Sequence, residues 1–161
     1  MAITVGTDTY VTVTEADTYI NKRPNATAWT ALTTAQKEGY LLVAREKIDL
    51  QNIRGQRYTE TQDLEFPRDF KLIADILGEV PTRVKESQTI EANMYANETA
   101  ATTDIRNGIK SRSIKSASVT YSDKKSNNSG LKLDSTMARM KLGPYLLKTI
   151  TRRWYYGIYI T

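Results

Sequence analysis

The sequence predicts a mainly α-helical fold: a small helical bundle with one extended β-hairpin or loop arm and an extended C-terminal tail. Three observations support this prediction. Two capping boxes each open a segment in which apolar residues recur at three- and four-residue steps, as in amphipathic helices. Between residues 110 and 121 the period falls to two, which is typical of a strand or hairpin. The chain then ends on residues rich in aromatic and Ile side chains.

The first two helices are predicted from their start signals. The capping box at residues 12–15, Thr-Val-Thr-Glu, precedes a short helix from about Val13 to Lys22. Trp29 is expected in a short connector after it. A second capping box, Thr-Thr-Ala-Gln at residues 33–36, opens a helix over about Ala35 to Leu50, where the apolar spacing is most regular.

The middle of the chain changes character. Residues 51–68 combine Gly, polar residues and Pro, and we expect an ordered loop pinned by Leu64 and Phe66. A short helical piece is expected at about Phe70–Leu77, ending at Gly78.

A third substantial helix is predicted from Thr82 to about Glu98, because Pro81 is suited to a helix start. The most apolar face of this predicted helix is only weakly apolar. It could therefore pack against a neighbouring subunit as much as against the core of its own chain. The adjoining positions are Val84, Ser87, Glu91, Met94 and Tyr95.

The last third of the chain begins with the period-two segment at residues 110–121, followed by a polar loop at 122–130. Asp134 or Ser135 can cap a final helix that contains Met137, Met140 and Leu142 and ends near residues 143–144. We therefore divide one domain overall into a helical bundle (1–104), a basic hairpin or loop arm (105–131), and a C-terminal helix with an aromatic tail (132–161).

The amino-acid composition excludes several kinds of site and shows an uneven distribution of charge. The chain has 161 residues and neither Cys nor His, which excludes disulfides, Cys or His zinc sites, thiol nucleophiles and Ser-His-Asp triads. Residues 1–104 hold 11 basic and 16 acidic side chains, whereas residues 105–161 hold 12 basic and 2 acidic ones. This asymmetry suggests that the second part meets something acidic: nucleic acid, a protein surface, or the acidic part of another copy. We expect no membrane span and no signal peptide.

The C-terminal tail is the main candidate site. Exposed apolar groups with Arg are typical of contact surfaces, so we expect an arm that docks on another chain; a last strand within its own domain is the alternative. The residues concerned are Arg152, Arg153, Trp154, Tyr155, Tyr156, Ile158 and Tyr159.

The basic arm is the second candidate. Its side chains could neutralise phosphates, although a charged run is more often a solvated face, and stacking platforms are scarce there. It could equally contact an adjacent subunit or the next tail component. The residues are Lys110, Arg112, Lys115, Tyr121, Lys124 and Lys125.

Catalysis is not expected. The carboxylate pairs Asp63/Glu65 and Glu86/Glu91 do not lie in apolar runs that would raise a pKa, and no phosphate loop, nucleotide fingerprint or metal-ligand spacing occurs. We predict no enzyme activity, no cofactor and no metal.

The order of several short motifs over about residues 8–147 resembles the head–tail adaptor proteins of tailed bacteriophages, in particular the family labelled DnaT-like single-stranded-DNA-binding. The motifs are Tyr10–Tyr19, Trp29, Ala44–Asp49, Arg54-Gly55, Gln62–Arg68, Val80–Val84 and Ser118–Ser122.

This resemblance implies a non-catalytic structural protein of the virion neck, assembled in the host bacterial cytoplasm. Such adaptors form a dodecameric ring beneath the portal, extend the DNA channel and present a surface to the next neck or tail-terminator protein. The expected partners are therefore the portal protein, further copies of the chain, that neighbouring component and, non-specifically, genomic DNA, but not a membrane. The alternative is a single-stranded or non-specific DNA-binding protein.

Overall fold

The computed structural model describes residues 3–70, 78–98, 111–114, 117–120 and 133–147. Within them the fold class is confirmed: helices dominate, and the strands form two short antiparallel pairs. The helices are α1 (Val13–Ile20), α2 (Thr27–Thr30), α3 (Thr34–Asp49), α4 (Thr82–Ala96) and α6 (Thr136–Leu142), with the 3-10 turn η2 (Gly143–Tyr145). The strands are β1 (Gln56–Arg57), β2 (Arg68–Asp69), β3 (Ser111–Ile114) and β4 (Ala117–Thr120).

Both predicted capping boxes are confirmed. At the start of α1 the Thr12 hydroxyl accepts from the Glu15 amide, and the Glu15 carboxylate accepts from the Thr12 amide. Thr33 and Gln36 repeat this exchange at α3. Each box satisfies amide groups that have no partner inside the helix, which fixes where the helix begins.

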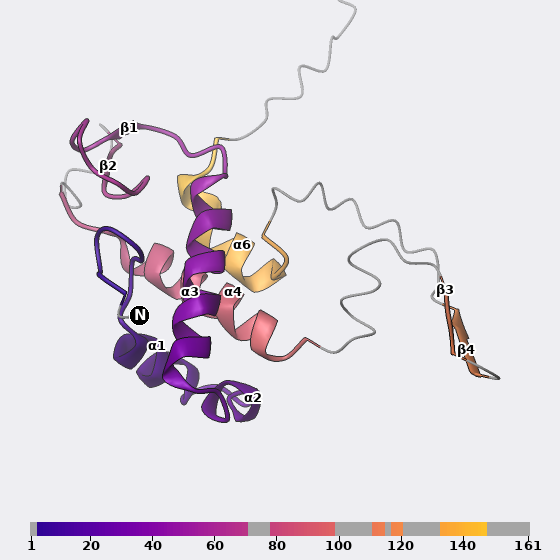
Figure 1. Cartoon of the computed structure of the whole chain (residues 1–161). Helices are drawn as coiled ribbons and strands as arrows, with labels where there is room; N and C mark the ends of the chain where they lie inside the picture. Colours follow the sequence, from indigo (N-terminus) through magenta and orange to yellow (C-terminus); the bar gives the residue numbers. More distant parts are fainter. Residues whose placement is uncertain (1–2, 71–77, 99–110, 115–116, 121–132, 148–161) are drawn as a thin grey trace, which may run out of the picture.

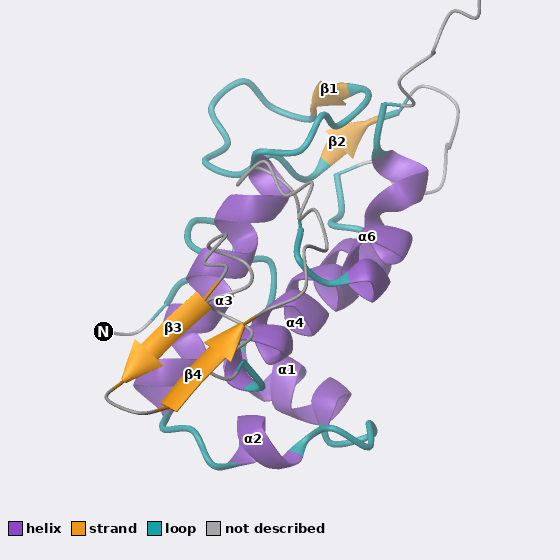
Figure 2. Cartoon of the chain, turned by 90° about the vertical axis from the view of Figure 1, so that its right-hand side faces the viewer, coloured by secondary structure: helices purple, strands orange, loops and turns teal. Residues whose placement is uncertain are grey.

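Helix α4 is the centre of the bundle. It packs against α3 and α6 and also contacts α1 and α2 (Figures 1 and 2). Its weakly apolar face lies inside the chain's own core, because the polar side chains on it are partnered by neighbouring segments. The Ser87 hydroxyl donates to the Ala138 carbonyl at 2.9 Å. Gln88 donates to the Leu41 carbonyl at 2.9 Å and accepts from the Tyr10 amide at 3.1 Å.

Two groups of buried apolar residues surround α4. One lies toward α1 and α2, and Trp29 belongs to it. The connector expected at Trp29 is in fact the four-residue helix α2, which turns the indole inward so that its N–H donates to Asp17 at 2.7 Å. The other group joins the loop to α6 and contains Tyr10, Ile48, Leu64, Phe66 and Tyr145 among its members.

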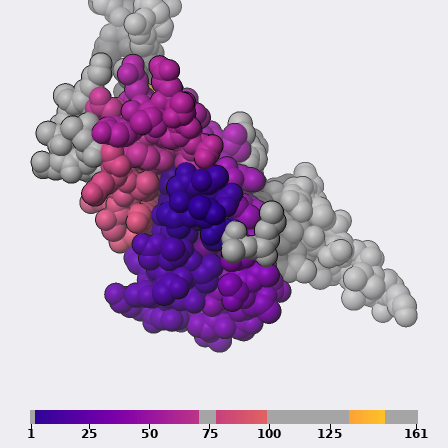
Figure 3. Space-filling model, turned by 60° about the vertical axis from the view of Figure 1, so that its left-hand side comes forward, coloured from indigo at the N-terminus to yellow at the C-terminus, as the bar shows by residue number. Residues whose placement is uncertain are grey.

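The ordered loop after α3 is confirmed, with Leu64 and Phe66 buried as its anchors. Its ends are joined by the pairing of β1 with β2, and the Phe66–Pro67 peptide is cis. Gly55 stands at φ +80°, and a Cβ there would lie 2.4 Å from the Asp69 carbonyl oxygen, so this turn requires glycine. The N-terminal segment lies across one face of the molecule, between this loop and the α1–α2 region (Figure 3). The helix expected at Phe70–Leu77 falls mainly on residues outside the described part.

The predicted period-two segment is a hairpin: β3 pairs antiparallel with β4 from Ser111↔Thr120 to Ile114↔Ala117. The final helix α6 is capped by Ser135, whose hydroxyl accepts from the Ala138 amide at 3.3 Å. Among the described residues, none of the helices is both long and apolar enough to span a membrane.

Candidate functional site

Most of the predicted contact residues lie outside the described part of the chain. This applies to all seven tail residues, from Arg152 to Tyr159, and to five of the six residues of the arm: Lys110, Lys115, Tyr121, Lys124 and Lys125. Arg112 is placed, in strand β3. The described residues nevertheless define the point from which the tail starts.

The chain enters the tail from a fixed position on the bundle. The Leu147 amide donates to the Asn52 carbonyl at 2.8 Å, and the Arg54 amide donates to the Tyr145 carbonyl at 3.0 Å. Ile53 and Leu146 thereby form an antiparallel bridge. We call residues 52–54 and 145–147 together the tail root.

Exposed apolar side chains lie on the segment that leads into the tail. On α6, Ala138 and Leu142 are buried, whereas Met137 and Met140 are 49% and 69% exposed. Leu147, in the tail root, is 55% exposed. Large exposed apolar groups grouped on one segment are typical of contact surfaces rather than of a solvated helix.

The start of α6 is held by a buried carboxylate that the sequence analysis missed. Glu91 of α4 is completely buried and accepts from the amides of Asp134 at 2.7 Å and Ser135 at 2.9 Å. The Tyr95 hydroxyl lies 3.1 Å from the same carboxylate. A negative group suits this position, because the first amides of a helix have no partner within it. The inward spacing of residues 84, 87, 88, 91 and 95 on α4 is the signal that would have identified it.

A second contact fastens the same point to α3. The Lys47 ammonium forms an ion pair with Asp134 and lies 5.2 Å from the centre of the Tyr95 ring. The segment that follows the basic arm is therefore attached to both α3 and α4 before α6 begins.

Tyr10 and Asp49 form a buried pair beneath the loop. The Tyr10 hydroxyl donates to Asp49 and accepts from the Phe66 amide at 3.3 Å, and Arg45 lies 3.6 Å from the same carboxylate. Burial is the main cause that raises the pKa of Tyr10, and Asp49 adds to it. Burial also raises the pKa of Asp49. The pair fixes the loop on α3.

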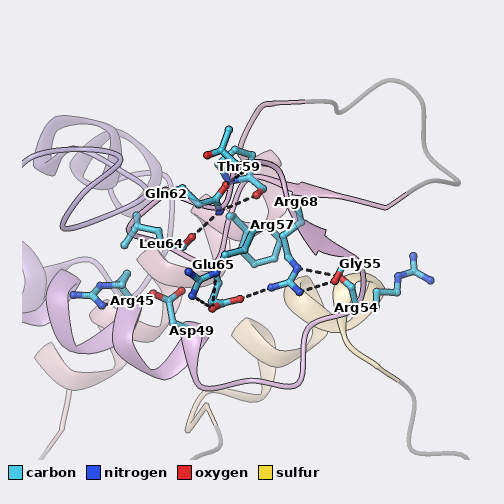
Figure 4. A network of polar contacts seen from close by, with 12 residues as sticks. Arg45, Asp49, Arg54, Gly55, Arg57, Thr59, Gln62, Leu64, Glu65 and Arg68 are labelled. Atoms are coloured by element: carbon cyan, nitrogen blue, oxygen red, sulfur yellow. Dashed lines mark hydrogen bonds and ion pairs between the residues drawn. The ribbon is translucent and has the colours of Figure 1, made fainter.

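Arginines gather on the loop next to the tail root (Figure 4). Arg57 and Arg68 both form ion pairs with Glu65, and Arg68 also donates to the carbonyls of Arg54 at 3.1 Å and Gly55 at 2.6 Å. Figure 4 shows the Arg54 side chain extending away from this network.

Arg54 differs from these neighbours. Its Nε is buried without a hydrogen-bond partner, and its guanidinium lies 6.0 Å from the centre of the Phe70 ring. An open pocket of about 290 Å³ is lined by the next residue, Gly55, together with Gln56, Asp69 and Phe70. The tail root therefore carries a positive charge that no carboxylate in the described part neutralises.

Three carboxylates that were considered for catalysis have partners in the described part of the chain. The described residues contain no group of acidic side chains placed to hold a metal ion. Of the carboxylates considered for catalysis, Glu91 is used as a helix cap and Glu65 joins two arginines, while Glu86 pairs with Lys141.

Comparison with known proteins gives one family. The family model described as "Putative DnaT-like ssDNA binding protein" matches residues 2–156. No curated protein and no solved structure matches the chain. The family part of the resemblance drawn from the motifs is thus confirmed, while the head–tail adaptor role stays a prediction. Because the match covers nearly the whole sequence, the chain belongs to the DnaT-like ssDNA-binding protein family.

Proposed function

We propose that the chain is a head–tail adaptor of a tailed bacteriophage, a structural protein without catalytic activity. In this proposal it forms a ring, dodecameric in the adaptors it resembles, beneath the portal in the virion neck. The ring extends the DNA channel used in genome packaging and ejection. It joins the head to the next neck or tail-terminator protein, and it assembles in the host bacterial cytoplasm.

The tail root is the observation that carries this proposal. Hydrogen bonds at 2.8 and 3.0 Å fix the chain up to Leu147, and the residues that follow include Trp154, Tyr155 and Tyr156. Aromatic and Arg side chains are enriched among the residues that dominate binding energy. A rigid root that presents such a segment suits a protein whose role is to dock on another chain.

The surroundings of the root support the same role. Met137, Met140 and Leu147 are exposed on the segment that leads into the tail, and Arg54 adds a charge that lacks a carboxylate partner among the described residues. In a ring each subunit meets its neighbours through two different surfaces. A basic second part, with 12 basic and 2 acidic side chains after residue 104, suits an acidic partner surface.

The test is portal binding by the full chain and by two tail variants. One variant lacks residues 150–161; the other keeps the length but has Ser at Trp154, Tyr155, Tyr156 and Tyr159. Each is mixed with the portal protein of the same phage, and bound rings are identified by gradient sedimentation and electron microscopy. We expect the full chain to bind as a ring and both variants to lose binding.

A matched control distinguishes binding by the tail from non-specific attraction by the positive charges of the chain. Lys124→Ser with Lys125→Ser changes the arm and leaves the tail intact, so portal binding should persist. In the phage, loss of residues 150–161 should yield DNA-filled heads without tails. Normal virions from that deletion would reject the docking role of the tail.

The family description favours a second function, binding of single-stranded DNA. Here Arg112, Lys115, Lys124 and Lys125 would contact phosphates, and affinity would fall steeply with salt. Fluorescence anisotropy of a labelled single strand at two salt concentrations measures this dependence. Replacing both Lys124 and Lys125 should reduce the salt slope by about 1.4, at about 0.7 for each phosphate contact.

The two functions predict opposite results for the same pair of variants. The adaptor proposal requires that the tail deletion abolish portal binding, whereas the DNA proposal requires that the arm variant weaken DNA binding and lower its salt slope. Strong single-strand affinity together with no ring and no portal contact would replace the first proposal by the second.

A further inference from the structure

Two arginines near the tail root form no ion pair with any carboxylate in the described part of the chain. Arg54 is half-buried, and Arg83, in the first turn of α4, is exposed. Figure 4 shows the Arg54 side chain turned away from the Glu65 carboxylate that pairs with other arginines. The buried Nε of Arg54 also lacks a hydrogen-bond acceptor, which is unusual for a buried donor. Both positive charges therefore remain available to a partner.

Arg54 lies against Tyr145 through both its backbone and its side chain. The Arg54 amide donates to the Tyr145 carbonyl at 3.0 Å. The Arg54 guanidinium lies 6.0 Å from the centre of the Phe70 ring, and the centres of the Phe70 and Tyr145 rings are 5.4 Å apart. One aromatic ring thus contacts both the cation and the phenol.

The pairing of α4 with α6 brings Arg83 to the same place. The two helices run antiparallel, with contacts in the order Glu91–Ser135, Ser87–Ala138 and Glu86–Lys141. One turn beyond the last contact, α4 reaches Arg83 and the other segment reaches Tyr145. Burial raises the pKa of Tyr145, and the charges of Arg83 and Arg54 oppose this rise, as expected for two cations close to its hydroxyl.

The Tyr145 hydroxyl has no hydrogen-bond partner among the described residues. Tyr145 is only 6% exposed, and its ring packs against Phe66 and Phe70. A tyrosine buried to this extent usually has a partner for its O–H group. A negatively charged acceptor would satisfy the hydroxyl and both guanidinium groups at once.

The start of α4 adds to this preference for negative charge. Its N-cap, Pro81, gives no side-chain hydrogen bond, and the first turn contains no acidic residue. The amides of Thr82 and Arg83 have no acceptor in the part of the chain that the structure describes. Free amides at a helix start carry partial positive charge, so an anion held by Arg83 would be stabilised by them as well.

Guanidinium groups bind carboxylates and phosphates alike, but the surroundings favour a carboxylate on a protein. Leu147 of the tail root is 55% exposed, and Leu50, two residues before the root, is 57% exposed. Exposed apolar groups are typical of protein contact surfaces, and Arg and Tyr are enriched among the residues that dominate their binding energy. Residues 1–104 also hold 16 acidic against 11 basic side chains, a balance that disfavours DNA.

We infer that Arg54, Arg83 and the Tyr145 hydroxyl bind an acidic side chain of the protein on which the tail docks. We call these three groups the carboxylate site. The inference rests on the proposed function, which makes that protein the portal. It adds the chemistry of the contact: an Asp or Glu carboxylate is held by charge-assisted hydrogen bonds at the point where the tail leaves the bundle.

Acetate, the simplest carboxylate probe, tests the site in the isolated full chain. Acetate replaces chloride at constant ionic strength, and the side-chain Nε–H signals of the arginines are followed by NMR. We expect the signals of Arg54 and Arg83 to shift together and to saturate, while that of Arg23 stays unchanged. Shifts of equal size at all three arginines, without saturation, would overturn the inference.

Tyr145→Phe separates binding from folding. The variant keeps the ring that packs against Phe66 and Phe70 and removes a hydroxyl without a partner in the described part, so Tm should not fall. The acetate concentration at half-saturation should rise about threefold or more, because one hydrogen bond is lost. An unchanged concentration would show that the hydroxyl does not belong to the site.

Portal binding identifies the partner. Arg54→Gln with Arg83→Gln should raise the Kd for the portal about tenfold or more. The matched control is Lys22→Gln with Arg23→Gln, which removes the same charge after α1, at the end of the bundle opposite β1 and β2 (Figure 1). This control should change the Kd little. Equal weakening by both pairs would reduce the effect to net charge and contradict a specific site.

Failure of the inference and failure of the adaptor proposal give different results. If the Arg54/Arg83 variant binds the portal as tightly as the parent, the adaptor role stands without this site. If the full chain binds acetate at the site but binds no portal, the adaptor proposal and the portal as partner fail, while the carboxylate site remains. If the same variant binds single-stranded DNA more weakly and the portal normally, the anion is a phosphate and the inference is wrong.

Discussion

Replacing Glu91 by Ala should cost the protein a large share of its stability. Glu91 is fully buried, and its carboxylate accepts from the amides of Asp134 and Ser135 at 2.7 and 2.9 Å. In the Ala variant both amides lose their acceptor, and the Tyr95 hydroxyl loses a neighbour at 3.1 Å. Because an unsatisfied buried polar group costs about 1–3 kcal/mol, the free energy of unfolding should fall by about 3–5 kcal/mol.

That loss is large against the total of about 5–15 kcal/mol expected for a domain. Glu91→Gln should cost less, about 1.5–3 kcal/mol, because it keeps one acceptor but turns an amide donor toward the other N–H. The matched control is Glu86→Gln on the same helix. Glu86 forms a half-buried ion pair with Lys141 and is no helix cap, so its replacement should cost less, about 1 kcal/mol.

Urea denaturation followed by circular dichroism measures the three variants, and hydrogen exchange locates the effect. The amides of α6 should exchange faster in both Glu91 variants, and those of α1 should change little unless the whole bundle unfolds. If Glu91→Ala unfolds within about 1 kcal/mol of the parent, the buried carboxylate does not hold α6, and the reasoning is wrong.

Three further predictions concern other parts of the bundle. Gly55→Ala should cost about 1–3 kcal/mol because φ is +80° and its Cβ would collide with the Asp69 carbonyl, whereas Gly39→Ala should stabilise by about 0.5–1 kcal/mol; urea midpoints of the two variants compare them. Thr33→Ala should lower the free energy of unfolding by about 1 kcal/mol, because α3 loses its cap. Thermal unfolding compares the variant with the parent, and an equal Tm would contradict this prediction. Because burial raises the pKa of Tyr10, the unfolded chain loses this proton first; stability should therefore fall as the pH rises above about 10, and less so in Tyr10→Phe.

Signals between residues close in the sequence were sufficient to predict the helix starts, the hairpin and the anchors of the loop. The helix starts at Thr12 and Thr33 follow from side chains within four residues of one another, and so does the cap of α6 at Ser135. The alternation of residue types with a period of two identified the hairpin, because its two paired strands are neighbours in the sequence. Leu64 and Phe66 were identifiable as anchors, since they are the large apolar residues of an otherwise polar loop.

Features that depend on distant partners were not predictable in this way. The weakly apolar face of α4 did not indicate which segment packs on it. Its polar residues form hydrogen bonds with groups more than 40 positions away in the sequence. Ser87 bonds to Ala138, Gln88 to Leu41 and Glu91 to Ser135. The sequence around a buried polar residue does not indicate which distant group will form its hydrogen bond. The same limit applies to the tail root, where residues 52–54 meet 145–147.

The tail root also determines how the bundle would respond to traction on its C-terminal end. A pull on the chain beyond Leu147 reaches the Leu147–Asn52 and Arg54–Tyr145 hydrogen bonds before it reaches helix α6. Hydrogen bonds in an antiparallel pair lie perpendicular to the strands, so a force along the chain shears them together instead of opening them one at a time. Tension that passes this point arrives at α6, whose far end is tied to α4 and α3 through Glu91 and Lys47. Mechanical stress at the C-terminus is thereby shared by three helices.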